Sequence, residues 1–341
     1  MDSVLITGGC GFMGSHVVRH FSRAYPDHKL VNLDLLTYAG NLDNIRDIGG
    51  ETDGHYEFIR GDVCDSRLVE RLFEKYHFTL VVHLAAETHV DRSIFNVSDF
   101  IRTNVEGTRV LLEAVRMHKV PHMVHVSTDE VYGNISNGFS VEDAALNPSN
   151  PYAASKAAGD MLARTYRMVY GTPVSIVRSG NNYGSHQYPE KFIPLVITNL
   201  IADEKIPVHG GGGHVRSWVY VDDFCKAIDR IAYSTHAPDT YNVAGEHRTN
   251  LEIIELVARY LRKNHEVLLS HTKDRPAADL RYAPDASKIE RKLGWGRRHS
   301  IDEVMGYVVD WYLKNKAWWL AIKSKKEFLH HYEIQSKAQW Y

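Results

Sequence analysis

Short apolar runs alternate with helix-like segments along the first half of the chain. Each run has the length of a buried strand, and three of the six end at glycine, aspartate or threonine. The runs occupy residues 3–9, 29–34, 56–63, 80–86, 122–128 and 173–179. Between them, residues 16–25, 66–76 and 103–118 have helical spacing, and a further helix is expected to begin after Pro151. Strands and helices in this order predict an α/β fold with a doubly wound parallel sheet.

The character of the sequence changes after about residue 180. Two long polar or glycine-rich stretches, SGNNYGSHQYPEKF and HGGGGHVRSWVYVDD, follow the last strand of the series. Their aromatic and charged residues favour function over disorder. We expect a first domain over residues 1–180, with later segments interleaved, and a smaller C-terminal substrate-binding domain over residues 181–315. The aromatic and basic tail 316–341 is interpreted as a docked helix, with a partner-binding segment as the alternative.

Composition and charge exclude several classes of function. The 341 residues carry a formal net charge of -2, which gives no electrostatic basis for binding nucleic acid or an anionic membrane. No apolar run approaches the roughly 20 residues that span a bilayer, and the chain enters a strand at once, so no signal peptide is expected. Cys10, Cys64 and Cys225 include no CxxC pair, which favours reduced thiols in a cytoplasmic protein. The 20 histidines show no repeated metal-ligand spacing, so no metal site is predicted.

The segment TGGCGFMGS places Gly8, Gly11 and Gly14 between the first strand and the first helix. Glycine lets backbone amides approach a pyrophosphate, and the helix N-terminus favours its negative charge. Asp34 ends the second strand, 20 residues after Gly14, where a carboxylate would bind the adenosine ribose and repel a 2′-phosphate. A Rossmann-type domain that binds NAD rather than NADP is therefore predicted, against the alternative of a glycine turn with a surface aspartate.

Further residues are expected to border this cofactor. Asp62, at the end of another strand, is predicted to contact the adenine ring. The others lie in the glycine loop and near the ends of the third and fourth strands: Phe12, Met13, Val63, Leu84, Ala85 and Ala86.

The segment PYAASKAAGDM places Tyr152 and Lys156 four residues apart, on one face of a helix. A nearby ammonium and a positive nicotinamide both lower the pKa of a tyrosine, so the pair can take a hydroxyl proton while a hydride leaves the same carbon. Alone, the spacing would fit a surface pair. With the glycine loop and HVST upstream, the chain resembles the extended short-chain dehydrogenase/reductases that act on nucleotide sugars. The resemblance implies that Thr128 hydrogen-bonds the 4-hydroxyl of the sugar and that Tyr152 and Lys156 also border NAD.

Two acids, Asp129 and Glu130, follow the strand that ends in HVST. Oxidation of a hexose at C4 needs no carboxylate pair. A 4-ketone, however, makes the C5 proton acidic, and loss of the C6 hydroxyl then requires a base at C5 and an acid at C6. Two adjacent carboxyl groups can supply both, because packing them together raises the proton affinity of one. The alternative is that Thr128 or Asp129 only caps a helix.

The motif TDEVYG resembles the dTDP-glucose 4,6-dehydratase family, as do the runs VNLDLLTYAGNLDN, AAETHVDRSI, NNYGSHQYPEKFIPLVI and VRSWVYVDD, over roughly residues 3–315. The resemblance implies NAD-dependent conversion of dTDP-glucose to dTDP-4-keto-6-deoxyglucose by C4 oxidation, loss of water across C5 and C6, and hydride return to C6. It implies Asp129 as the acid at C6 and Glu130 as the base at C5. It also implies a homodimer formed through residues 100–115 and the helix that carries Tyr152. The residues that it implies on the substrate side are Thr88, Asn181, Glu190, Lys191, His209, Arg216, Asn242, Arg275 and Tyr282, with His89 and Arg92 in a loop that closes the site.

The chain departs from this family on the nucleotide side. His209 stands in PVHG where a Tyr is usual, and Ser217 stands where an Asp is common. In RPAADLRY, Ala278 replaces a His and Leu280 replaces an Arg. UDP-glucose or another nucleotide sugar is therefore an alternative substrate. A 4-epimerase is less favoured because it needs no acid pair, and a non-catalytic NAD-binding protein is disfavoured because the catalytic positions are intact.

Overall fold

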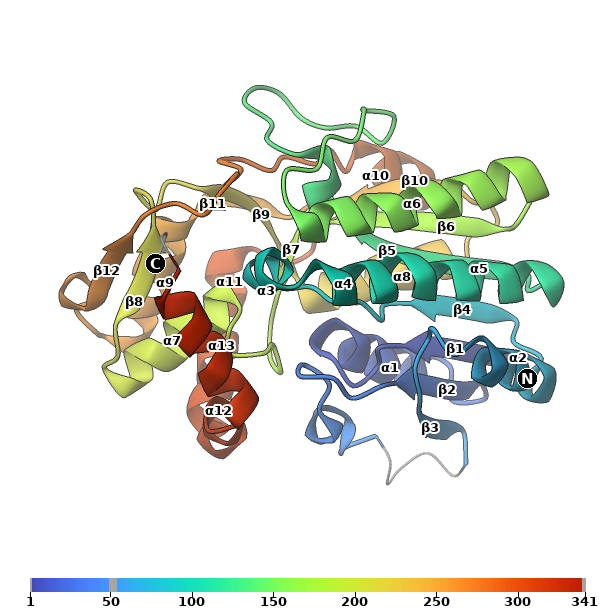
Figure 1. Cartoon of the computed structure of the whole chain (residues 1–341), viewed down its shortest axis with the longest axis horizontal. Coiled ribbons are helices and arrows are strands. Elements are labelled where there is room, and N and C mark those ends of the chain that lie inside the picture. Colours follow the sequence, from blue (N-terminus) through green and yellow to red (C-terminus); the bar gives the residue numbers. More distant parts are fainter. Residues whose placement is uncertain (1, 49–53, 339–341) are drawn as a thin grey trace.

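The computed structural model describes residues 2–48 and 54–338, and its largest element is a seven-stranded sheet (Figure 1). The strand order is β10-β6-β5-β4-β1-β2-β3, and every pairing is parallel. The strands are β1 (Ser3–Thr7), β2 (Lys29–Asp34), β3 (Tyr56–Arg60), β4 (Leu80–His83), β5 (His122–Thr128), β6 (Val174–Ser179) and β10 (Thr240–Val243). The prediction of a doubly wound α/β fold is confirmed.

Helices cover both faces of this sheet, and part of this cover comes from the second half of the chain. One face carries α1 (Phe12–Ala24), α8 (Val221–Ala232) and α10 (Ser287–Leu293). The other face carries α2 (Ser66–Tyr76), α5 (Thr108–Met117) and α6 (Pro151–Tyr170). Because α8, β10 and α10 all follow residue 180, the second half of the chain completes the first sheet.

The strand order creates a crevice at one edge of the sheet. From β1 the chain proceeds outward through β2 and β3 in one direction, and through β4, β5, β6 and β10 in the other. Ligands of doubly wound sheets bind where the strand order reverses, outside the carboxyl ends of the strands. The segments after β1, β4 and β5, which begin at Gly8, Leu84 and Asp129, all leave the sheet at this edge.

The helix predicted over 103–118 is divided in the structure. The short helices α3 (Val90–Phe95) and α4 (Val97–Phe100) lead into a π-helix, η2 (Ile101–Gly107), which continues as α5. Within η2, the Asn104 side chain accepts a hydrogen bond from Glu87 N at 2.9 Å and donates to Glu87 O at 3.0 Å and to Ser155 Oγ at 2.8 Å. Widened helical turns of this kind are frequent at functional sites. Here Asn104 fixes the loop after β4 to α6, beside the crevice.

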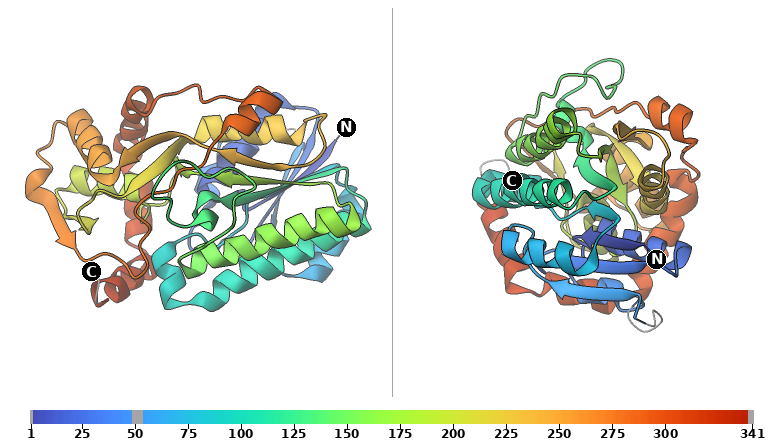
Figure 2. Two further views of the ribbon diagram at one scale, coloured as in Figure 1. Left: turned by 90° about the horizontal axis from the view of Figure 1, so that it is seen from above. Right: turned by 90° about the vertical axis from the view of Figure 1, so that its right-hand side faces the viewer.

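A second lobe lies at one end of the seven-stranded sheet (Figure 2). It contains a sheet of β7 (Asn181–Tyr183), β9 (Val215–Tyr220) and β11 (Glu246–Thr249), and a pair of β8 (Ile206–His209) and β12 (Leu269–Thr272). Helices α7 (Phe192–Ala202), α9 (Asn250–Leu261) and α11 (Ile301–Lys314) enclose its core. Val196, Ile254 and Met305, one from each helix, are fully buried there.

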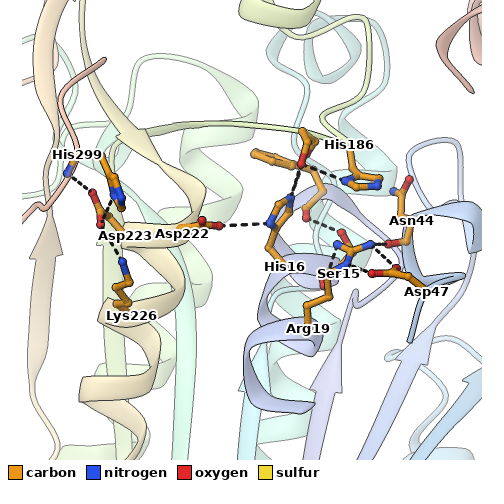
Figure 3. Close-up of polar contacts among 12 residues, drawn as sticks. Ser15, His16, Arg19, Asn44, Asp47, His186, Asp222, Asp223, Lys226 and His299 are labelled. Carbon is orange, nitrogen blue, oxygen red and sulfur yellow. Dashed lines mark hydrogen bonds and ion pairs between the residues drawn. The ribbon is translucent and has the colours of Figure 1, made fainter. Parts of the chain in front are cut away.

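Polar contacts join α1 to the second half of the chain (Figure 3). His16 Nε2 lies 3.1 Å from Ser185 O, and its Nδ1 lies 3.7 Å from the carboxylate of Asp222 at the start of α8. The next residue, Asp223, accepts a hydrogen bond from His299 Nδ1 at 2.9 Å. These contacts hold α1 against α8 and the loop at Ser185, and hold α8 in turn against the segment that leads into α11.

The C-terminal helices α12 (Lys316–Lys323) and α13 (Lys326–Ser336) dock on the rest of the molecule, beside α7 in Figure 1. Trp319 enters the core of the second lobe. Ile322 and Phe328 pack with Tyr38 and Tyr188, which come from distant loops. The interpretation of this segment as docked helix therefore holds for residues 316–338, and residues 339–341 lie outside the described residues.

A buried histidine ties β1, β4 and α5 together. His83 Nδ1 accepts a hydrogen bond from Thr7 Oγ1 at 2.8 Å, and its Nε2 donates to Thr108 Oγ1 at 3.1 Å, because the Thr108 hydroxyl itself donates to Asn104 O. This network requires the neutral imidazole with its proton on Nε2. Burial, assisted by the positive charge of Lys156, lowers the pKa of His83 to about 3.

Replacing His83 with Gln should make stability less dependent on pH on the acid side. The unfolded histidine binds a proton below its ordinary pKa of about 6.5, whereas the folded one stays neutral down to about pH 3. Protonation of His83 in the unfolded chain therefore lowers the free energy of unfolding by about 2 kcal/mol at pH 5 relative to pH 7. Urea unfolding should give a change in unfolding free energy between pH 7 and pH 5 that is smaller by that amount in His83→Gln than in the wild type. His330→Gln, an exposed control, should keep the wild-type difference, and equal differences in all three proteins would contradict the buried neutral His83.

Candidate active site

The glycine loop between β1 and α1 forms a cradle at the crevice. Gly8 has a φ of 73°, and Gly11 N donates to Gly8 O at 3.1 Å. A Cβ at Gly8 would lie 2.7 Å from Ala85 N, and a Cβ at Gly14 would collide with the Gly8 carbonyl. The glycines thus let the loop pass close to the end of β4 while the N-terminus of α1 faces the crevice.

The structure places all thirteen residues predicted to border the cofactor along one cleft of about 270 Å³. Asp34 accepts hydrogen bonds from Leu36 N at 2.8 Å and Cys10 N at 2.9 Å, and burial raises its pKa. Asp62 is only partly buried, and the backbone N–H of Cys64 and the guanidinium of Arg102 lower its pKa. Both carboxylates are therefore held in place by the chain at the mouth of the cleft.

Tyr152 and Lys156 both face this cleft from α6. Lys156 Nζ donates to the Val126 carbonyl at 2.6 Å, and burial lowers the pKa of Lys156 to about 8. Burial and the negative charge of Glu130 raise the pKa of Tyr152, while a hydrogen bond with Thr128 opposes them. Tyr152 is therefore a phenol at neutral pH unless further positive charge comes near it.

The acid pair begins at the end of β5. Thr128 caps the short helix η3 (Asp129–Tyr132), since its Oγ1 accepts a hydrogen bond from Glu130 N at 3.2 Å, and it also lines the first cleft. Asp129 is 2% exposed, and its Oδ2 is buried without a hydrogen-bond partner among the described residues. Burial, reinforced by the charge of Glu130, raises the pKa of Asp129 well above its ordinary value. Burial and the neighbouring charge therefore favour the protonated form of Asp129.

Glu130 lies in a different electrostatic environment from its neighbour. Its Oε2 accepts a hydrogen bond from Asn150 Nδ2 at 3.4 Å and lies 3.4 Å from the Tyr282 hydroxyl, which donates its proton to Asp279 Oδ2 at 2.8 Å. Burial raises the pKa of Glu130, but the guanidinium of Arg216 and the Asn150 hydrogen bond oppose this rise. Of the two acids, Glu130 is thus the one with support for its ionised form. The sequence analysis missed Asn150, whose position as the residue before Pro151 marked it only as a helix cap.

A second cleft, of about 190 Å³, opens toward the second lobe and meets the first cleft at Thr88, Glu130, Asn181 and Lys191. Lys191 Nζ donates to Thr88 O at 2.7 Å. Eight of the residues predicted on the substrate side line it: Thr88, Asn181, Glu190, Lys191, His209, Arg216, Arg275 and Tyr282. The two clefts and their shared residues form one continuous site, with the acid pair at the junction.

The prediction for Asn242 is wrong. Asn242 is fully buried in β10 and lines neither cleft. Its side chain accepts from the Tyr132 hydroxyl at 2.8 Å and donates to Ser140 O at 2.8 Å, and its N–H donates to Glu142 at 2.9 Å. With all its polar groups engaged, Asn242 secures η3 and the loop after it to the sheet.

Three potential metal ligands that are far apart in the sequence meet beside the second cleft. His89, Glu190 and His331 each offer a ligand atom, and these atoms lie within 4.8 Å of one another. Arg92 donates to the Glu190 carboxylate through Nε at 3.0 Å and through Nη2 at 2.9 Å. Motif spacing could not predict this cluster, because His331 comes from α13 and is brought in only by the docking of the C-terminal helices.

Comparisons with known proteins agree with this arrangement. The family described as GDP-mannose 4,6 dehydratase matches residues 5–307. The dTDP-glucose 4,6-dehydratase of Escherichia coli is 39% identical, over 93% of this chain and 95% of that protein, and the enzyme of Streptomyces niveus is 41% identical, over 95% and 96%. The crystal structure of DesIV, a dTDP-glucose 4,6-dehydratase from Streptomyces venezuelae with NAD and TYD bound, is similar with a TM-score of 0.90 at 42% identity, covering 94% of this chain and 100% of DesIV.

At pH 7, Asp129 should give the infrared absorption of a protonated carboxyl group, because burial and Glu130 raise its pKa. The band should be missing from Asp129→Asn in a difference spectrum. Asp222→Asn is the control, since the hydrogen bond from His16 lowers the pKa of Asp222 and its carboxylate is ionised. A band that survives Asp129→Asn would assign the proton to another acid, such as Glu87, whose pKa burial raises to about 7.

Proposed function

The chain belongs to the GDP-mannose 4,6 dehydratase family, and on that premise we propose that it is an NAD-dependent hydro-lyase that converts dTDP-glucose to dTDP-4-keto-6-deoxyglucose. One observation carries this proposal. Two adjacent carboxyl groups of different proton affinity, Asp129 and Glu130, lie beside Tyr152 at the junction of the two clefts. An epimerase that only inverts C4 has no use for such a pair, so this alternative is disfavoured.

The first cleft fits NAD on the geometry of its residues. A side chain at Gly8 or Gly14 would fill the cradle or clash with it, and the N-terminus of α1 offers backbone N–H groups to a pyrophosphate. Asp34 would accept from the ribose hydroxyls and would repel the 2′-phosphate of NADP. When bound, NAD supplies a reversible hydride acceptor, so that the sugar can pass through a 4-ketone.

Thr128, Tyr152 and Lys156 are assigned to the C4 oxygen of the sugar. The hydroxyls of Thr128 and Tyr152 are linked by a hydrogen bond and can bind this oxygen together. Tyr152 takes the C4 hydroxyl proton when it is ionised, which the ammonium of Lys156, one helical turn away, and the positive nicotinamide both favour. The raised pKa of Tyr152 makes it ready to return that proton afterwards.

Glu130 and Asp129 are assigned to the elimination. Once C4 is a ketone, Glu130 removes the C5 proton as a carboxylate whose charge Arg216 supports. Asp129 gives its proton to the C6 hydroxyl, which leaves as water, and the unpartnered Oδ2 of Asp129 is the atom available for this contact. Transfer of one proton to Glu130 and of another from Asp129 keeps the total charge of the pair constant through the step.

Arg216 and Arg275 are assigned to the diphosphate, because a guanidinium offers paired donors to phosphate oxygens. Of the four departures from the family pattern, His209 and Ala278 line the second cleft. Leu280 is 59% exposed, and the buried Ser217 accepts a hydrogen bond from Gly245 N at 2.9 Å; neither residue lines the second cleft. Any shift in nucleotide preference therefore depends on His209 and Ala278.

The test of this function is mass spectrometry after incubation of the purified protein with dTDP-glucose and, separately, with UDP-glucose, with and without added NAD. We expect dTDP-glucose to lose the mass of one water, because elimination across C5 and C6 changes the formula by that amount. Loss of water from UDP-glucose alone would favour the UDP-glucose alternative. An unchanged mass with an altered C4 configuration would instead favour the epimerase.

Replacing Glu130 with Gln should stop exchange of the C5 hydrogen with deuterated solvent while C4 oxidation persists. The amide cannot accept the C5 proton, whereas Tyr152 and Thr128 still hold the C4 oxygen. Deuterium incorporation followed by mass spectrometry measures the first step, and the absorbance of the bound cofactor measures the second. Asp129→Asn should differ by allowing C5 exchange but no loss of water. Loss of both steps in Glu130→Gln would contradict this division of roles.

A homodimer built through η2, α5 and α6 is the second part of the proposal. These helices lie side by side on the outside of the molecule, with no other element covering them in Figure 2. Large apolar side chains on them are exposed to solvent: Ile101, Met117, Met161 and Met168. An exposed apolar face of this kind is typical of a subunit interface.

Light scattering should therefore give a dimer at micromolar concentration, and Met161→Glu with Met168→Glu should give a monomer, because two charges would have to be buried. Tyr307→Glu, at an exposed apolar position on α11, is the control and should remain dimeric. A wild-type monomer would overturn this part of the proposal.

The protein is also assigned to the cytoplasm. All three cysteines are free thiols, as expected in a reducing compartment. Over residues 2–48 and 54–338, no helix has both the length and the apolar character needed to cross a membrane.

A further inference from the structure

Helix α13, near the C-terminal end of the chain, forms part of the wall of the second cleft. Tyr332 and Gln335 on this helix line the cleft together with His209 and Arg275. The match to the family ends at residue 307, so α13 lies outside the segment on which family membership depends. Its contribution to the cleft is a property of the C-terminal segment of this chain.

A series of buried polar contacts connects the helix to Arg275. Gln335 Nε2 donates a hydrogen bond to one carboxylate oxygen of Asp91, and the other oxygen lies 2.5 Å from Nε of Arg275. Asp91 is fully buried, whereas the Arg275 side chain is 34% exposed and borders the cleft. An ion pair made through Nε leaves the two terminal amino groups of a guanidinium for a second anion.

Apolar and aromatic contacts hold α13 in this place. Ile322 of α12 and Phe328 of α13 pack with Tyr38 and Tyr188. The guanidinium of Arg92 lies over the Tyr38 ring, 3.8 Å from its centroid, and Tyr188 lines the first cleft. The C-terminal helices are thus packed against the loops that border both clefts.

The charges around α13 indicate which kind of group this end of the cleft binds. His331 meets His89 and Glu190, and each of these residues has a buried polar atom without a hydrogen-bond partner among the described residues. Burial and the positive charges of Lys191 and Arg275 keep the pKa of His89 well below its ordinary value. A divalent cation would add charge to a region that is already cationic, whereas phosphate oxygens would be attracted to it.

We propose that α13 is a functional wall of the nucleotide-sugar cleft and that Gln335, acting through Asp91, positions Arg275 for the diphosphate of the substrate. Because Gln335 binds one oxygen of Asp91, the carboxylate is held with its other oxygen beside Nε of Arg275, and this ion pair keeps the guanidinium charge at the cleft. Arg275 is the residue that contacts the substrate, and Gln335 is a positioning residue. This inference rests on the proposed function, since that function assigns a nucleoside diphosphate sugar to the second cleft.

The first test is Gln335→Met, which removes the donor and keeps an unbranched side chain of similar length. We expect the dissociation constant for dTDP, measured by calorimetry on the full-length protein, and KM for dTDP-glucose to rise roughly tenfold, the effect of losing one hydrogen bond to a charged group. The value of kcat should change less than about twofold, because the chemical steps at C4, C5 and C6 are assigned to other residues.

Two further variants accompany this test. His330→Met changes an exposed residue of the same helix and should leave the affinity for dTDP unchanged. Gln335→Asn keeps an amide that is too short to reach Asp91, and it should show the same loss of affinity as Gln335→Met. If Gln335→Met does not fold, Gln335→Asn tests in its place whether loss of the hydrogen bond to Asp91 weakens dTDP binding.

A double-variant cycle separates positioning of Arg275 from general loosening of the helix. In an Arg275→Lys background, Gln335→Met should weaken dTDP binding by far less than tenfold, because residues that act through one contact are not additive. Equal fold-changes in the two backgrounds, or unchanged affinity and KM in Gln335→Met, would overturn the inference. These outcomes are distinguishable from failure of the proposed function, which would appear as wild-type protein that does not dehydrate dTDP-glucose.

Discussion

Two carboxyl groups placed side by side in a buried site cannot both remain ionised, and the arrangement around Asp129 and Glu130 follows from this constraint. Burial next to a negative charge raises the pKa of Asp129 well above its ordinary value. The ionised form of Glu130 is supported by the charge of Arg216 from β9 and by a hydrogen bond from Asn150 at the start of α6. Two distant parts of the chain must therefore converge on the end of β5 for the two acids to differ in proton affinity.

The same convergence joins the cofactor side of the site to the substrate side. The first cleft is built at the reversal of strand order, from loops that follow β1, β2, β4 and β5. The second cleft needs the second lobe and α13. The acid pair belongs to both clefts through Glu130, which lines the first and the second. This sharing places residues from the ends of the strands, from η3 and from α6 next to residues from later segments of the chain.

The distribution of charge differs between the whole chain and the site. The formal net charge of -2 gives no basis for a general affinity for polyanions, yet Lys191, Arg216 and Arg275 line the second cleft, and Arg92 pairs with Glu190 at its wall. Several of these cations are oriented by partners within the protein, Arg92 by Glu190 and Arg275 by Asp91. Side chains that are ordered before a ligand arrives lose less entropy on binding it.

The sequence by itself determined the parallel sheet, the glycine loop with Asp34, the Tyr152–Lys156 pair and the acid pair, because each of these depends on residues close together in one strand, loop or helical turn. Only the tertiary structure decided how the two acids differ in proton affinity, since that depends on burial and on the hydrogen bond that Glu130 accepts from the distant Asn150. It also decided that Asn242 is structural, that β10 completes the first sheet, and that Tyr332 and Gln335 line the second cleft. These features depend on contacts between segments far apart in the chain, and neither periodicity nor motif spacing carries information about such contacts.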